Sequence, residues 1–316
     1  MSRIALGVSS ALLLILVVLG VLWSVTPEPL TLSQQDRELR GPGNGATSTR
    51  MLIRIGDTLL TKSGGYISND VTPPAWWLDN IQNWEFGVLL QVRDFTRVLR
   101  NEISRSQSQS TEDSALGQAE PFFNVHNDSW LFPAAETEYR KGLNQLQDYL
   151  DRLQSQPQQA QFYARADNLV DWLRVVEKRL GSLVQRLGMS VGKQAVISPA
   201  ERGEAAGGDV SETAVRTPWL EIDDVFFEAR GSAWALLGLA RAAEKDFAAV
   251  LSDKNAGVSF RQIIRELESA NQALSTPMIL NGGGFSMWPN HSLVMASYLG
   301  AANSAVANLI VLLENG

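Results

Sequence analysis

The stretch FYARADNLVDWLRVVEKRLGSLVQRL, residues 162–187, decides the fold class. Its apolar side chains recur at alternating intervals of three and four residues, which is the spacing of one face of an α-helix. The residues of this stripe are Phe162, Ala166, Leu169, Leu173, Val176, Leu180, Leu183 and Leu187. The sequence therefore predicts a long amphipathic helix with a heptad-like seam.

The preceding segment carries the same pattern, in Tyr139, Leu143, Leu146, Leu150 and Leu153. The connection between the two segments, QSQPQQAQ at 154–161, is short and contains Pro157, which favours a helix end. We therefore expect an antiparallel, coiled-coil-like hairpin over residues 133–188, with a second helix roughly 40 Å long.

A third stripe extends from Ile222 to Val250 and is rich in alanine, which allows neighbouring helices to approach closely. No segment after residue 73 alternates apolar and polar residues for long enough to predict a strand. The fold class that follows is all-α, an elongated antiparallel helical bundle.

Three further segments bear on this architecture. Residues 105–120 and 188–218 are polar, and we interpret them as flexible loops or partner-binding segments. Residues 292–313 carry no charge, so they are either a second membrane span or a buried core helix. A polar stripe of Ser297, Ser304 and Asn308 favours the core helix.

The N-terminal region predicts a transmembrane helix. Residues 4–25, IALGVSSALLLILVVLGVLWSV, are uncharged and long enough to cross the hydrocarbon of a bilayer. A cleaved signal peptide is the alternative, but its apolar region is shorter and a small-x-small cleavage site should follow. No such site follows here, so we expect the lipid bilayer to hold the chain through residues 4–25.

Charge asymmetry gives the expected topology. Arg3 precedes the span, whereas the charges after it nearly cancel, so the positive-inside rule places the N-terminus in the cytoplasm. We predict a single-pass protein of a bacterial inner membrane. Its parts are a tip and anchor (1–25), a polar tether (26–50) and a helical periplasmic domain (51–316).

Composition excludes several function classes for this chain of 316 residues. Its net charge of −7 and its lack of basic clusters argue against a nucleic-acid partner. The chain has no cysteine and two histidines, so we expect no cofactor, no metal site and no recognisable catalytic residue.

Three of the nine tryptophans lie in SNDVTPPAWWLDNIQNWEFG, residues 68–87. Thr72 before Pro73 predicts a helix N-cap and first turn, with Val71 and Trp76 forming a hydrophobic staple. In that register the buried stripe begins with Trp77, Ile81, Trp84 and Val88 and continues through Val92, Phe95 and Leu99.

Structural packing explains all three tryptophans, and an aromatic recognition surface is the open alternative. For that alternative Asp79, Asn80 and Glu85 lie off the apolar stripe and would supply polar contacts. The expected partner face, in the region of residues 66–87, consists of Tyr66, Trp76, Asp79, Asn80 and Glu85.

Two catalytic hypotheses carry less weight. Glu268 in ELESAN resembles the catalytic glutamate region of helical lytic transglycosylases, but the companion motifs of those enzymes are missing. A metal site would require His126, Asp128 and the distant His291 to converge together with a fourth ligand.

Four segments resemble the landmarks of an uncharacterised proteobacterial family known as a domain of unknown function. They are GGYISND (64–70), PPAWWLDNIQNWEFG (73–87), WLFPAAETEYRKGL (130–143) and WPNHSLVMASY (288–298). The resemblance spans nearly the whole chain and implies a bacterial inner-membrane setting. The family has no assigned activity, so the resemblance implies no catalytic or ligand-binding residue.

The function expected from the sequence is that of a membrane-anchored periplasmic scaffold that binds an unidentified envelope protein. The seams also permit a homo-oligomer. A ligand-sensing bundle acting through a partner is the first alternative, and a cell-wall glycan-cleaving enzyme is the second.

Overall fold

The prediction of an all-α protein is confirmed. The structure is a computed structural model that describes residues 2–34, 36, 45–105, 112–155, 159–192, 217–274, 276, 278–282 and 287–315. Among these residues we find helices and one isolated bridge, between Asn281 and Asn290, and no strand. The helices are α1 (Ser2–Trp23), α3 (Ala46–Thr61), α4 (Asp79–Val98), α5 (Ser114–Phe123), α6 (Ala135–Ser155), α7 (Ala166–Ser190), α8 (Ile222–Asp246), α9 (Ala248–Asp253), α10 (Gly257–Ala270) and α11 (His291–Asn315).

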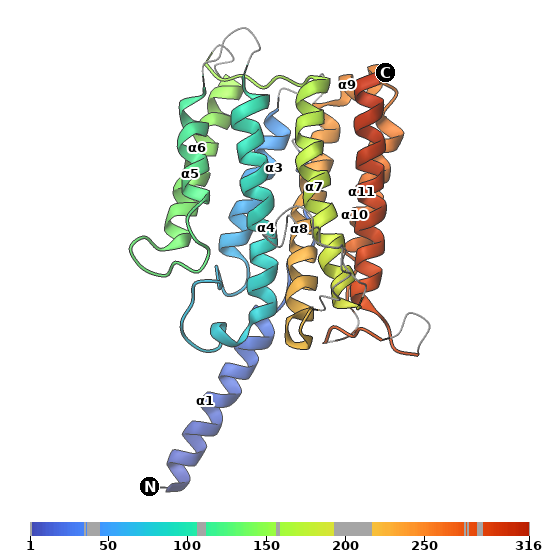
Figure 1. The fold of residues 1–316 in the computed structure, drawn as a ribbon. Helices are drawn as coiled ribbons and strands as arrows, with labels where there is room; N and C mark the ends of the chain where they lie inside the picture. Colours follow the sequence, from blue (N-terminus) through green and yellow to red (C-terminus); the bar gives the residue numbers. More distant parts are fainter. Residues whose placement is uncertain are drawn as a thin grey trace, which may run out of the picture.

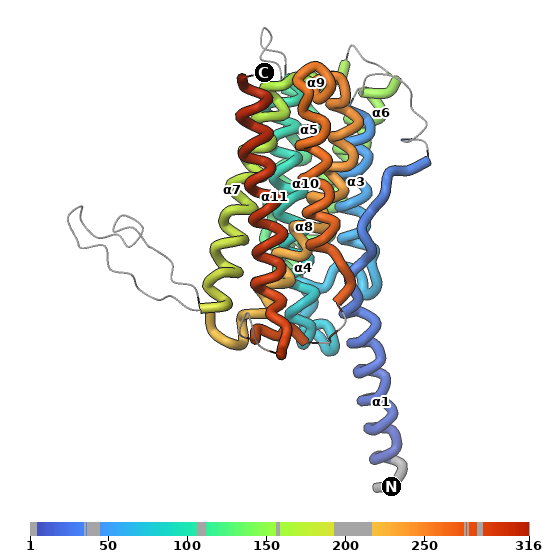
Figure 2. Tube along the Cα trace, turned by 90° about the vertical axis from the view of Figure 1, so that its right-hand side faces the viewer, coloured from blue at the N-terminus to red at the C-terminus, as the bar shows by residue number. Residues whose placement is uncertain are grey.

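The long helices run up and down a single bundle, and α1 projects from one end of it (Figure 1). We call this end the α1 end, since α3, α7 and α10 finish there and α4, α8 and α11 begin there. Figure 2 shows the same arrangement from the side, with the C-terminus at the opposite, far end.

The predicted apolar stripes form the core. On α7 the buried side chains include Leu169, Leu173, Val176, Leu180, Leu183 and Leu187. On α8 they include Ile222, Phe226, Ala229, Ala233, Leu236, Ala240 and Ala243. Val170 and Trp172 of α7 are buried as well, so its apolar face is wider than a coiled-coil seam and faces several neighbours.

The predicted hairpin over residues 133–188 is wrong, because α6 and α7 are not neighbours. α6 packs against α3 and α5, whereas α7 packs against α11 and α8 (Figure 1). The described residues of the connection before α7, 159–165, pass the π-helical turn Leu99–Ile103 that continues α4, where the Tyr163 amide donates to the Ile103 carbonyl at 2.8 Å. This path places α7 on the other side of α4 from α6.

Two glycines bring α4 and α8 into backbone contact. A Cβ atom at Gly87 would lie 2.1 Å from the Glu228 carbonyl oxygen, and one at Gly231 would lie 2.0 Å from the Trp84 carbonyl oxygen. The Ser232 hydroxyl donates to the Gly87 carbonyl across the same contact, at 3.1 Å. The alanine-rich stripe predicted that a helix approaches α8 closely, and it is Gly87 and Gly231 that allow the backbones of α4 and α8 to touch.

The segment expected to be a tether is packed where the structure describes it. The Trp234 indole donates to the Glu28 carbonyl at 2.9 Å, and Arg241 donates to the Leu30 carbonyl at 2.9 Å, so residues 28–30 lie along α8. Helix α3 begins at Ala46, inside the range assigned to the tether. Within that range, residue 35 and residues 37–44 lie outside the described residues.

The two segments expected to be loops are shorter than predicted. Helix α5 begins at Ser114 because the Asp113 carboxylate accepts hydrogen bonds from the Ala115 and Leu116 amides, as an N-cap does. Helix α7 continues to Ser190. Residues 106–111 and 193–216 lie outside the described part of the chain.

Helices α1 and α11 are both long and apolar enough to cross a membrane. They differ in burial, because 39% of the apolar window of α11 is buried and none of that of α1 is. α11 packs along α7 and α10, with Leu299, Ala302 and Val306 fully buried. This placement supports the core-helix interpretation of residues 292–313.

Candidate functional site

A buried ion pair organises the α1 end of the bundle. The Lys62 ammonium lies 2.6 Å from a Glu85 carboxylate oxygen, and both side chains are shielded from solvent. Glu85 also accepts hydrogen bonds from the Ile67 amide at 2.9 Å and from the Ser68 amide at 2.7 Å. The pair therefore fixes the loop of residues 62–70 against α4.

Burial raises the pKa of Glu85, while the Lys62 ammonium and the hydrogen bonds from Ser68 and Ile67 oppose that rise. The loop reaches the pair through a turn at Gly64 and Gly65, whose φ angles are +85° and +74°. This left-handed conformation is one that glycine adopts without steric strain.

The same loop connects α4 to the start of α6. The Tyr66 ring packs edge-on against Tyr139 at 5.6 Å between centroids, and its hydroxyl donates to the Asn127 carbonyl at 3.0 Å. The Asn69 amide donates to the Ser129 carbonyl at 3.0 Å and to the Glu136 carboxylate. The loop of residues 62–70 therefore joins α4 to the segment of residues 127–139, which is distant from both in sequence.

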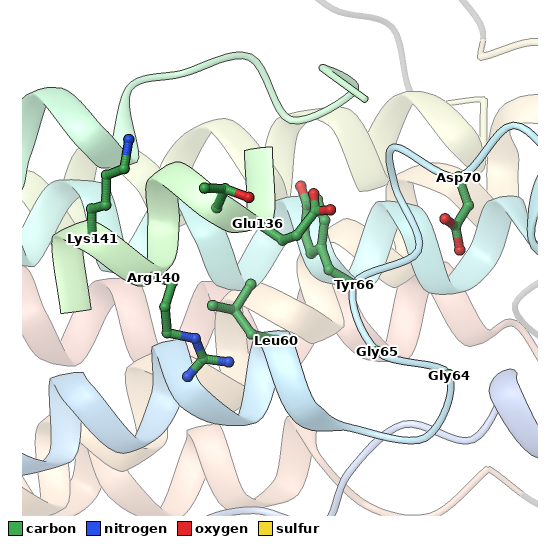
Figure 3. A pocket seen from close by; sticks show the side chains of 9 residues that line it. Leu60, Gly64, Gly65, Tyr66, Asp70, Glu136, Arg140 and Lys141 are labelled. Carbon is green, nitrogen blue, oxygen red and sulfur yellow. The ribbon is translucent and has the colours of Figure 1, made fainter. Parts of the chain in front are cut away.

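An open cavity of about 620 Å³ lies between this loop, α3 and α6. Figure 3 shows the side chains that line it, and they include both acids and bases: Asp70, Glu136, Arg140 and Lys141. Arg140 is paired with Asp57 at 2.5 Å, and Lys141 with Glu138 at 2.6 Å. The chemistry of the lining suits a small polar or zwitterionic molecule.

Of the five predicted partner-face residues, the structure leaves three accessible. Tyr66 and Glu85 are buried, so they hold the loop in place and do not reach the surface. Trp76 and Asp79 are exposed and Asn80 is half-buried. Glu85 lies off the apolar stripe of its helix, as expected. The loop of residues 62–70 nevertheless covers it, and the apolar pattern of α4 gives no information about that loop.

The predicted helix start at Pro73 is wrong, and with it the staple. α4 begins at Asp79 after a 3₁₀ turn over Ala75–Trp77. Thr72 and Pro73 precede prolines and so avoid the α-helical region, and Leu78, with φ −103° and ψ +58°, separates the 3₁₀ turn from α4. Val71 is 59% exposed and Trp76 is 63% exposed, so they form no buried contact.

Trp77 is 54% exposed, so its predicted place in the buried stripe is wrong. The stripe starts at Ile81 and includes Trp84, which is fully buried and packs edge-on against Trp234 at 5.1 Å. One of the three tryptophans is therefore core, and two lie on the surface.

Trp76 and Trp77 belong to a larger set that the sequence reasoning missed. The other exposed aromatic side chains among the described residues are Trp130, Phe132, Trp219 and Trp288. Each of the six lies within three residues of a proline, in a segment between amphipathic helices. Closeness to a proline in an interhelical segment is therefore the sequence feature that distinguishes these exposed aromatic residues from the buried ones on the helical stripes.

A second cavity, of about 190 Å³, lies between α8, α10 and α11. Arg230 lines it and donates to the Gln272 carbonyl at 2.9 Å. Burial lowers the pKa of Arg230 and also that of His291, which lines the same cavity. A buried cation there suits an anionic group.

The two catalytic hypotheses gain no support from the geometry. Arg241 pairs with Glu268 at 2.6 Å on a solvent-exposed face of the bundle. His126 and Asp128 lie in an exposed loop, whereas His291 accepts a hydrogen bond from the Leu280 amide. The described residues contain no group of three potential metal ligands.

Comparison with known proteins identifies a family. The family described as "Uncharacterized protein conserved in bacteria (DUF2333)" matches residues 2–316. Neither the curated proteins nor the solved structures include a significant match to the chain.

Proposed function

The chain belongs to the DUF2333 family of uncharacterised bacterial proteins, and from that premise we propose that it is a membrane-anchored scaffold of the bacterial cell envelope. In this proposal α1 is a retained transmembrane helix. The bundle then stands on the periplasmic side of the inner membrane, where it binds another envelope protein.

The observation that carries the proposal is the contact between α1 and the bundle. The Trp23 side chain packs on the core and lies over Gly64. A Cβ atom at Gly20 would lie 3.8 Å from the side chains of Pro74 and Leu78. A helix whose last turn packs into the folded domain functions as part of the mature protein, which favours an anchor over a cleaved leader.

The packing of α1 against the bundle would fix the position of the bundle relative to the membrane, as a scaffold requires. Because residues 28–30 are bonded to α8, there is no free linker between α1 and the bundle over that segment. The 25-residue helices α7 and α11 are about 38 Å long, so they hold surfaces at a set height above the membrane.

The first test is retention and topology. We expect mass spectrometry of the membrane-extracted protein to find residues 4–25 intact. A cysteine introduced at Val258, which is 68% exposed at the far end, should react with an impermeant maleimide once the outer membrane is opened. Loss of residues 4–25 would contradict the anchor, and labelling only after inner-membrane lysis would reverse the topology.

The second test is for a partner. Photocrosslinking probes are placed at Asp79 and Asn80, the accessible polar residues of the predicted partner face, and the exposed Lys178 on α7 is the control site. We expect a discrete protein adduct from the first two sites alone. Adducts of the chain with itself would indicate a homo-oligomer, and equal adducts from all three sites would count against a specific face.

The ligand-sensing alternative draws support from the cavity in Figure 3. A thermal-shift screen of small polar metabolites tests it, with Thr137→Trp, which fills the cavity, as the matched variant. A ligand that stabilises the native chain and not this variant would favour the sensor.

A further inference from the structure

The exposed aromatic side chains gather at the end of the bundle from which α1 leaves. The six, which we call the aromatic end, are Trp76 (63% exposed), Trp77 (54%), Trp130 (56%), Phe132 (91%), Trp219 (80%) and Trp288 (67%). At the far end, the large exposed apolar side chains in the described residues are Val258 and Val311, which are aliphatic.

Side-chain contacts tie these segments to the same end of the bundle. The 3₁₀ turn that carries Trp76 and Trp77 lies between Pro74 and Leu78, which flank Gly20 of α1. The loop that contains Trp130 is hydrogen-bonded to the segment that precedes this 3₁₀ turn, because the Asn69 amide donates to the Ser129 carbonyl.

The other two segments are tied through the starts of α8 and α11. Asn83 of α4 donates to the Asp224 carboxylate at 2.6 Å, which places the start of α8, directly after the turn that carries Trp219, beside the first turns of α4. His291 packs edge-on against Phe226, with 6.2 Å between ring centroids, so the segment before α11 lies there too. Both views show these helix starts at the end of the bundle from which α1 leaves (Figures 1 and 2).

The position of α1 determines what this end faces. If α1 spans a bilayer, its last turn, at Gly20–Trp23, lies where the hydrocarbon gives way to headgroups. The loop of Trp76 and Trp77 touches that turn, so the two indoles lie at the same depth as the membrane interface. Tryptophan is the side chain best suited to that layer, because its ring is apolar and its N–H finds polar partners.

We propose that the aromatic end docks into the interfacial layer of the same bilayer that α1 crosses. The inference rests on the proposed function, since it requires α1 to be a retained anchor. Two attachments, one through the span and one through the aromatic end, prevent the bundle from turning about α1. The bundle then presents one fixed orientation to its partner.

Neighbouring charges indicate how the docking works. Asp79 follows Trp77 by two residues, and Glu221 follows Trp219 by two residues, so acids flank the aromatic rings. Acidic side chains do not attract anionic lipids. The aromatic end therefore binds through its apolar rings, and zwitterionic lipid is sufficient.

The absence of cysteine from the sequence allows a direct test with the full chain. Single cysteines at Trp76, Phe132 and Trp219 carry an environment-sensitive NBD label, and Val258→Cys and Val311→Cys are the matched exposed controls at the far end. The labelled proteins are reconstituted into phosphatidylcholine vesicles, recovered by flotation, and exposed to lipid spin-labelled near the headgroup.

We expect all five proteins to float, the three aromatic-end labels to lose most of their fluorescence, and the two controls to keep theirs. Flotation with no quenching at any position would overturn the docking and leave the anchor intact. A blue shift at the aromatic end without quenching would overturn it in favour of a second copy covering that surface. Failure to float would overturn the anchor and the docking together.

Discussion

Replacing Gly231 by alanine tests the closest helix contact in the bundle. The added Cβ atom would lie 2.0 Å from the Trp84 carbonyl oxygen, where ordinary van der Waals contact begins at 3.4 Å. The obstacle is backbone, so a rotamer change cannot relieve it. α4 and α8 would have to separate by roughly 1 Å or more, along a contact that buries Trp84 and Trp234.

The magnitude follows from two opposing effects. Overpacking of this kind costs about 1–3 kcal/mol, and occasionally more. Alanine recovers up to about 1 kcal/mol through its higher helix propensity. Because both sides of the contact are backbone, we expect the overpacking to dominate and the free energy of unfolding to fall by about 1–3 kcal/mol. For a domain of this size the melting temperature should fall by roughly 2–12 °C.

Gly300→Ala is the matched control. It is also a glycine inside a long helix, but the nearest atom to its added Cβ, on Val184, lies 4.0 Å away. Helix propensity alone then acts, and the melting temperature should rise by about 2–4 °C. The assay is thermal unfolding of the full chain in mild detergent, followed by near-ultraviolet circular dichroism. Equal shifts in one direction for both variants would refute the steric argument.

Three other perturbations test the core and the α1 end. Lys62→Met leaves Glu85 buried without its cation and should lower the free energy of unfolding by about 3–5 kcal/mol, part of which a second change, Glu85→Gln, should restore. Urea unfolding of the single and double variants measures both effects, and a double variant as unstable as the single one would contradict the expectation. Leu173→Ala should cost about 2–5 kcal/mol, against almost nothing for the exposed neighbour Arg174→Ala, and an unchanged melting curve would be inconsistent with the α7 stripe. Burial, together with the negative charges of Asp79, Asp223 and Glu221, raises the pKa of Asp224 to about 6. The folded state therefore binds the Asp224 proton more tightly than the unfolded chain does, and stability falls as pH rises through about 6. Asp224→Asn should therefore raise the melting temperature more at about pH 8 than at about pH 5, and a larger gain at the acidic pH would reverse the sign of the argument.

The sequence by itself determined which segments are helical and which of their faces are apolar. Alternating intervals of three and four residues predicted the stripes of α6, α7 and α8, because helix periodicity is a local property. Length and lack of charge likewise predicted the apolar N-terminal helix.

Local register failed where the chain leaves regular structure. The double proline and the non-helical Leu78 put the start of α4 at Asp79, so Trp76 and Trp77 lie outside the stripe and are exposed on the bundle. The sequence contains part of this signal, since a residue before proline avoids the helical region.

Only the tertiary structure decided which helices pair and which polar groups are buried. An apolar stripe specifies that a face is covered, and many partners of similar shape can cover it, so it could not exclude the α6–α7 hairpin. Glu85 lies on the polar side of its own helix, and it is buried because a loop from elsewhere in the chain brings Lys62 and two amide donors to it. The physical reason is that helix periodicity depends on neighbours in sequence, whereas burial and pairing depend on neighbours in space.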